Sequence, residues 1–199
     1  MAEEAPDLNA EHCAIGQHFK RFPDREKVWH NAERRWYPLA EFETHVRIYD
    51  DRVRGWFLDA AQQLPTEGFV VLMIVVAYFE GNEQYRQGET SKNSSAAFFK
   101  SAFKRIFPGL PNDAAGKFYE QARCGLFHDG MIRRSIRISN QFGAAIEEKD
   151  GTLLLNPNRL LDVVRGDHAL YVRDLLDPKN DDLRGKFKRT WESRWSAAY

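Results

Sequence analysis

The chain has 199 residues, of which 43% are hydrophobic and 29% are charged. With 14 Phe, 7 Tyr and 5 Trp, this composition excludes a largely disordered chain. Basic and acidic residues number 29 each, which excludes a uniformly basic polyanion-binding protein. Two cysteines are too few for a disulfide scaffold, and the first residues lack the apolar core of a signal peptide. We therefore expect a cytoplasmic protein.

Residues 1–40 show no clear hydrophobic period, and we expect them to form an irregular N-terminal segment. Pro6, Pro23 and Pro38 interrupt this stretch. The one regular element that the spacing of apolar residues suggests here is a short helix over residues 24–35.

Two long helices are predicted next. A stripe of apolar residues at spacings of three and four predicts an amphipathic helix over 41–64. Its members are Phe42, Val46, Tyr49, Val53, Trp56, Phe57, Ala60 and Leu64. Pro65 ends this helix, and a second helix runs to Gly88. Two helices joined by so short a turn are expected to lie antiparallel.

The second of these helices contains an unbroken apolar run over 69–79. The run is shorter than the roughly 20 residues that a membrane-spanning helix needs. Glu67 and Glu80 also flank it closely. We therefore expect a buried central helix and no membrane contact.

The rest of the chain predicts further helices and one β-hairpin. Helical stripes cover 98–107, 113–128, 156–176 and 182–195. The pair Asp150-Gly151 stands between two short β-prone runs, which is typical of a hairpin turn. The expected fold is mainly α: an antiparallel bundle of four to five helices over 41–199, with a small β-hairpin insertion near 135–155.

The common motifs for catalysis and cofactor binding are missing from the sequence. It contains no HExxH or CxxC, no glycine-rich phosphate loop and no GxSxG. His12, Cys13 and His18 form a small group, but their spacing matches no standard zinc pattern. We therefore predict no metal site and no cofactor.

One short motif stands at the end of the helix predicted over 113–128. Arg123 and His128 are separated by four residues and are followed by Asp129-Gly130. Arg25 and His30 have the same spacing, but they lie in the N-terminal segment. The position of Arg123 and His128 after a long antiparallel helix pair resembles that of the Arg-x4-6-His motif in HEPN domains. These domains are helical bundles found in RNA-cleaving toxins and antiviral defence proteins. The resemblance covers about residues 41–134.

The resemblance implies metal-independent RNA cleavage, in which the 2′-hydroxyl attacks the adjacent phosphate. Arg123 would neutralise the phosphate and His128 would act as general acid or base. Glu80 is expected to support the site by orienting one of them. The alternative is that Glu80 marks where its helix emerges into water. In a regular α-helix, five residues rotate by about 140°, so Arg123 and His128 would point to different sides unless Gly130 lets the last turn unwind.

Simpler roles exist for the same residues. Arg123 would pair with Glu120 or Asp113, and His128 would interact with the helix dipole. Cys124 departs from the polar residue that HEPN proteins often carry directly after the Arg, and it would serve as a small apolar filler.

The charge around the motif favours a phosphate-bearing ligand. Residues 100–137 contain eight basic and three acidic residues within a neutral chain. The residues expected to contact RNA are Lys117, Arg133, Arg134 and Arg137.

The sequence thus predicts a HEPN-like RNA-binding or RNA-cleaving protein of a defence or toxin system. The alternative is a non-catalytic helical interaction module with the same fold, which Cys124 favours slightly. We also expect a homodimer with Arg123 and His128 near the interface. Leu126, Phe127 and Met131 would supply apolar contacts, and Gly125 would permit close backbone approach.

Overall fold

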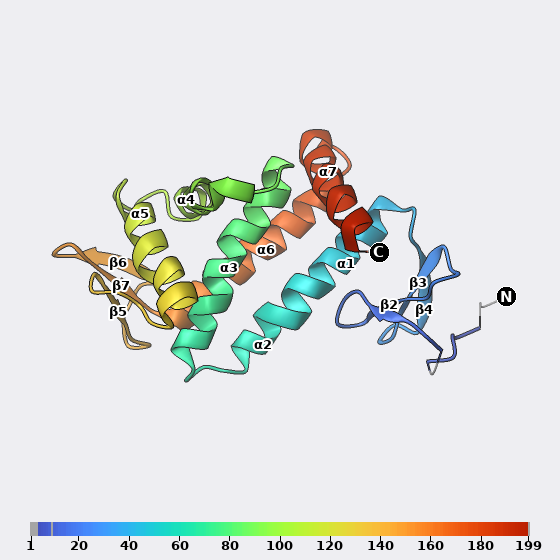
Figure 1. Ribbon diagram of the computed structural model, residues 1–199, viewed down its shortest axis with the longest axis horizontal. Coiled ribbons are helices and arrows are strands. Elements are labelled where there is room, and N and C mark those ends of the chain that lie inside the picture. Colours follow the sequence, from blue (N-terminus) through green and yellow to red (C-terminus); the bar gives the residue numbers. More distant parts are fainter. Residues whose placement is uncertain (1–3, 9, 199) are drawn as a thin grey trace.

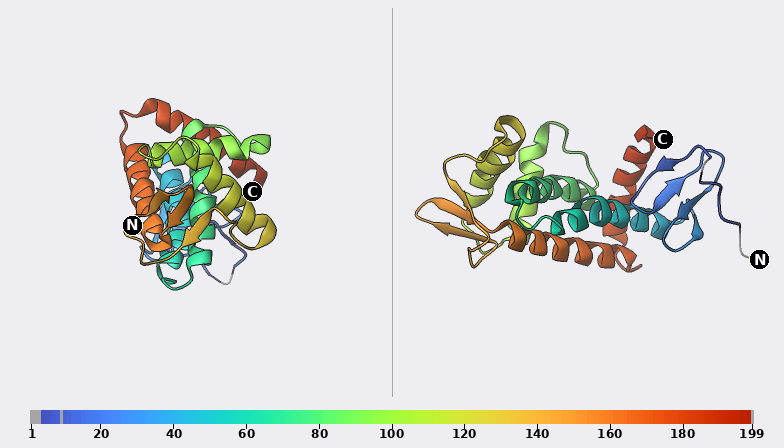
Figure 2. Two further views of the ribbon diagram at one scale, coloured as in Figure 1. Left: turned by 90° about the vertical axis from the view of Figure 1, so that its left-hand side faces the viewer. Right: turned by 90° about the horizontal axis from the view of Figure 1, so that it is seen from below.

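The computed structural model describes residues 4–8 and 10–198 (Figure 1). Helices fill the middle of an elongated molecule, and two small sheets lie at its opposite ends (Figures 1 and 2). Helix accounts for 56% and strand for 13% of the structure. The fold is therefore mixed α/β, and the prediction of a mainly α bundle with one hairpin was wrong.

The first sheet occupies the segment that was expected to be irregular. Its four strands are antiparallel and follow one another in chain order. They are β1 (Cys13–Ala14), β2 (Phe19–Arg21), β3 (Lys27–His30) and β4 (Arg35–Pro38). The expected helix over 24–35 does not form, because these residues belong to two strands and the turn between them.

Cross-strand pairs explain why β3 and β4 prevail over the helical spacing. Val28 stands opposite Tyr37, and both are buried in a core shared with the helices. Trp29 stands opposite Trp36, with their rings in edge-to-face contact at 5.4 Å between centroids. Aromatic pairs of this kind stabilise an antiparallel ladder. Because the strands are short and carry many charges, their alternation is hard to recognise in the sequence alone.

The helical body begins with one continuous rod, formed by α1 (Phe42–Asp50), the π-helix η1 (Asp51–Leu58) and α2 (Asp59–Gln62). Helix α3 (Gly68–Gln87) follows and packs against α4, α6 and α7. The later elements are the 3₁₀ turn η2 (Lys92–Ser94), α4 (Ser95–Ile106), α5 (Ala114–Phe118), the π-helices η3 (Tyr119–Arg123) and η4 (Gly125–Asp129), α6 (Pro157–Leu176) and α7 (Asp181–Ala198). In the described part of the chain, no helix has the length and apolar character to cross a membrane.

The π-helix η1 changes which residues of the rod are buried. Trp56 and Phe57 belong to the predicted apolar stripe, yet they are 43% and 50% exposed. Leu58 and Ala61 are buried in their place. A π-helix has i→i+5 hydrogen bonds and therefore more residues in each turn than an α-helix, so the side chains after it rotate away from the α-helical stripe. The result is an apolar surface on η1 that faces outward.

The second sheet lies between η4 and α6. It contains β5 (Ile136–Ile138), β6 (Ile146–Lys149) and β7 (Thr152–Leu155) in the order β5-β7-β6. Strands β6 and β7 form an antiparallel hairpin through Asp150 and Gly151. Strand β5 pairs with β7 in parallel, so the insertion is a three-stranded mixed sheet. No turn signal in the sequence marks β5, because the residues that follow it lead to β6, which is not its neighbour in the sheet.

A polar network crosses the interface of α3, α4 and α6. Asp167 of α6 accepts hydrogen bonds from Tyr78 (2.8 Å) and Arg86 (3.2 Å) of α3 and from Arg105 of α4. Arg105 also donates to Glu83 of α3 at 3.3 Å. Burial raises the pKa of Asp167, but Arg105 and Arg86 outweigh it and hold the pKa below its ordinary value.

We expect Asp167→Asn to lower the free energy of unfolding by about 2 kcal/mol at pH 7, since it leaves the partly buried Arg86 without its counter-charge and removes one of the two carboxylates that bind Arg105. Wild-type protein should lose stability as the pH falls below about 4, because the unfolded chain then binds a proton that folded Asp167 does not. Urea unfolding at several pH values measures both effects. The acid loss should be smaller in the variant.

Asp182→Asn is the matched control for this measurement. Asp182 pairs with Lys186 within α7, and its side chain is 82% exposed. Loss of an exposed pair should cost less than about 0.5 kcal/mol. Equal effects of the two substitutions would contradict a structural role for the Asp167 network.

Candidate functional site

Arg123 and His128 lie on a single helix that changes from α-helix to π-helix partway along its length. Helix α5 continues without a break into η3 and η4 and ends at Gly130, which is left-handed with φ of 68°. The backbone N–H of Cys124 donates to Tyr119, and that of Gly130 donates to Gly125. These i→i+5 bonds define a π-helix, in which residues five apart are about one turn apart. The backbone thus brings Arg123 and His128 toward the same side, where the regular α-helix expected from the sequence would separate them.

Glu80 on α3 holds Arg123. The guanidinium Nη2 of Arg123 donates to Oε2 of Glu80 at 3.3 Å. Ser91 donates its hydroxyl to the other oxygen, Oε1, at 2.7 Å. The side chains of Arg123 and Glu80 are 23% and 17% exposed, so the pair is partly accessible to a ligand. The structure therefore joins Arg123 to Glu80, rather than to the Glu120 or Asp113 considered from the sequence.

Two aromatic rings complete the surroundings of Arg123. Its guanidinium lies 5.0 Å from the ring centroid of Phe127 and 5.7 Å from that of Tyr119. Both contacts are of the cation–π type. Neither ring was expected as a partner of Arg123. Each lies four residues from Arg123, and this helical spacing would have predicted the contacts. Ser91, in the loop after α3, has no comparable signal.

His128 is exposed at the last turn of η4. Within the described residues its imidazole has no hydrogen-bond partner, and Glu80 contacts Arg123 without contacting His128. The imidazole is therefore free to form a hydrogen bond with a bound molecule.

Only part of the expected basic surface is available. Lys117 is bound by Glu148 at 2.6 Å, and Arg133 is bound by Asp129 at 2.7 Å. Two further arginines expected to contact RNA, at positions 134 and 137, are exposed and make no ion pair within the described residues. The excess of positive charge around the motif is thus reduced by internal carboxylates.

The turn after the motif packs against the motif helix itself. A Cβ on Gly125 would lie 2.5 Å from the carbonyl oxygen of Met131. The close approach that we expected Gly125 to offer a second protomer is therefore used within the chain. Leu126 is buried, while Phe127 and Met131 are 48% and 59% exposed. The expected apolar surface thus consists of the latter two residues without Leu126.

An apolar pocket of about 430 Å³ opens beside the motif. Its walls come from α1, η1, α3, η4 and α7 and include Phe57 of η1, Met73 of α3 and Phe127 of η4. All three side chains are at least 39% exposed. The motif thus combines with its surroundings in two ways. Arg123 and His128 form a polar group that suits a phosphate. The apolar surface beside them has no partner within the described residues.

We expect Gly125→Ala to lower the free energy of unfolding by about 2 kcal/mol, because the added methyl group collides with a backbone oxygen that has no room to move. Gly166→Ala is the control: nothing lies within 4 Å of the added Cβ in α6, and alanine should stabilise this helix by up to about 1 kcal/mol. Urea unfolding monitored by circular dichroism distinguishes the two. An unchanged free energy of unfolding in Gly125→Ala would contradict this expectation and show that the turn after the motif can shift to make room.

Comparisons of the chain with models of known protein families, with curated proteins and with solved structures find no match.

Proposed function

We propose that this chain is a HEPN-like RNA-binding protein that cleaves RNA without a catalytic metal, in a cytoplasmic defence or toxin system. The observation that carries the proposal is the pairing of a fixed cation with a free imidazole. Glu80 holds Arg123, and His128 follows one π-helical turn later without a partner in the described residues. The likeness of the motif to that of HEPN domains supports the same reading.

The proposed chemistry uses Arg123, His128 and the RNA, together with a second proton-transfer group from a partner copy. His128 removes the proton of a 2′-hydroxyl, whose oxygen attacks the adjacent phosphorus. The bond to the 5′-oxygen of the next nucleotide then breaks, and that oxygen takes up a proton. The products are a 2′,3′-cyclic phosphate and a 5′-hydroxyl. Arg123 has five N–H donors and gives one to Glu80, so others remain to neutralise the charge that builds on the phosphate.

The same proposal includes a homodimer. One imidazole cannot be base and acid at once, and a second protomer supplies the other proton-transfer group. The exposed side chains of Phe57, Met73 and Phe127 line a pocket that adjoins the motif. A second copy of the chain placed on this surface would cover it and bring two motifs together.

One observation favours the alternative, a non-catalytic interaction module. Carboxylates within the chain already bind Lys117, Arg123 and Arg133. An RNA-binding surface would lose charge through such pairs, whereas a protein-binding surface would not depend on it.

We expect His128→Ala and Arg123→Ala each to reduce cleavage of single-stranded RNA by at least about 100-fold, because each removes a group that acts on the transition state. The assay uses buffer without added metal ions and follows the appearance of cyclic phosphate ends.

His12→Ala is the matched control. It removes a histidine that directly precedes β1 of the first sheet, far from the motif helix, and should leave the rate unchanged. Equal cleavage by wild type and by His128→Ala would remove the catalytic assignment and leave the interaction module.

We expect the wild-type chain to show about twice the 23.1 kDa of one chain in light scattering, and Phe127→Asp to show a single chain. A carboxylate in this interface would lose its hydration, and that cost opposes association even though Arg123 lies close enough to pair with it. Leu170→Asp is the control, since Leu170 on α6 is exposed to 50% and Phe127 to 48%. A monomeric wild type, or dissociation by both substitutions, would contradict the proposed interface.

A further inference from the structure

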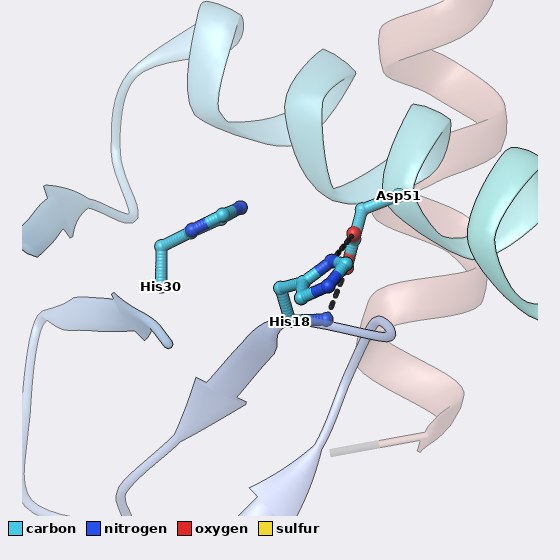
Figure 3. Close-up of side chains that lie close together, drawn as sticks. All are labelled: His18, His30 and Asp51. Atoms are coloured by element: carbon cyan, nitrogen blue, oxygen red, sulfur yellow. Dashed lines mark hydrogen bonds and ion pairs between the residues drawn. The ribbon is translucent and has the colours of Figure 1, made fainter. Parts of the chain in front are cut away.

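Two histidines of the N-terminal sheet meet an aspartate of the helical body. His18 directly precedes β2, His30 ends β3, and Asp51 is the first residue of η1 (Figure 3). The two imidazole rings are stacked, with 5.5 Å between centroids and 25° between planes. One nitrogen or oxygen atom from each of the three residues lies within 4.8 Å of the others. Strand pairing explains the histidines' proximity, because Phe19 stands opposite His30 in the sheet.

The carboxylate of Asp51 is enclosed by the loop that carries His18. Asp51 is only 7% exposed. It accepts hydrogen bonds from the backbone N–H of His18 at 2.8 Å and from Nδ1 of the same residue at 2.8 Å (Figure 3). The backbone N–H of Phe19 contributes a longer bond of 3.4 Å. Asp51 is thus fixed in position between the sheet and η1.

We propose that His18, His30 and Asp51 bind one Zn²⁺ ion. Two imidazoles and a carboxylate form a donor set that suits zinc, whereas Mg²⁺ and Ca²⁺ prefer oxygen ligands throughout. Water would fill the fourth position of a tetrahedral zinc site. The site does not depend on the proposed function, since Arg123 and His128 belong to other elements.

Zinc binding at His30 would displace one hydrogen bond of this residue. Nδ1 of His30 accepts from the backbone N–H of Glu33 at 3.0 Å, so neutral His30 carries its proton on Nε2. Coordination through Nε2 moves that proton and breaks this bond. The bond is exposed, so water can replace it.

Zinc at this position would have a structural role. His18 and His30 belong to the sheet, and Asp51 belongs to the helical rod, so one ion would link the two parts of the molecule. Short strands of two to four residues form this sheet, and such small sheets gain stability from a metal linked to a larger body.

The test is zinc titration of the full chain after treatment with a chelator and its removal. We expect isothermal titration calorimetry to show one Zn²⁺ per chain and thermal unfolding to shift upward with zinc. His30→Gln and His18→Gln should each weaken zinc binding by at least about tenfold. His30→Gln is the more informative variant, because it leaves the hydrogen bonds to Asp51 in place.

His12→Gln provides the control. His12 lies near the same sheet and contacts Lys20, but it is not part of the cluster. It should bind zinc as the wild type does. Failure of the wild type to bind one Zn²⁺, or equal binding by His30→Gln and His12→Gln, would overturn the proposal. Circular dichroism of each variant without zinc confirms that it is folded before titration.

Discussion

The placement of α3 governs the rest of the structure, and buried charge fixes that placement. Along one helix, Tyr78, Glu83 and Arg86 engage Asp167 of α6 and Arg105 of α4. Hydrogen bonds between charged groups are directional and weaken steeply when their geometry changes. The network therefore fixes the register of three helices. Glu80 lies on the same helix. The register in which α3 binds Asp167 therefore also sets the position of Glu80, the partner of Arg123.

Two departures from regular α-helix shape the surface around the motif. In η1 the π-helix turns apolar side chains outward, and in η3 and η4 it brings Arg123 and His128 toward one side of the helix. π-helical turns are rare and are found frequently at functional sites. Here they create both an exposed apolar surface and a fixed cation beside it. The two features meet at Phe127, which lines the apolar pocket and stacks on Arg123.

Sequence patterns predicted the helices well and the sheets poorly. The predicted helices over 41–64, 66–88 and 156–176 are present, because long apolar stripes and strong end signals such as Pro65 and Asn156 act locally. The strands depend on cross-strand partners, and a four-residue strand such as β3 carries too few alternations to be recognised. At the motif, the sequence offered Glu80 as a residue that orients Arg123 or His128, and in the structure Glu80 pairs with Arg123. The sequence contained no sign that His18 and His30 meet Asp51, because strand register brings distant residues together.

The two ends of the elongated molecule, each with a sheet, differ in their content of tryptophan and therefore in their fluorescence. Four of the five tryptophans lie at the end with the first sheet: Trp29 and Trp36 are in its strands, and Trp191 and Trp195 stack on each other in α7. Arg21 of β2 covers the ring of Trp195. The motif helix contains tyrosine and phenylalanine, and neither this helix nor the second sheet contains tryptophan. Intrinsic tryptophan fluorescence therefore follows the N-terminal end almost alone, while far-ultraviolet circular dichroism follows the helical body.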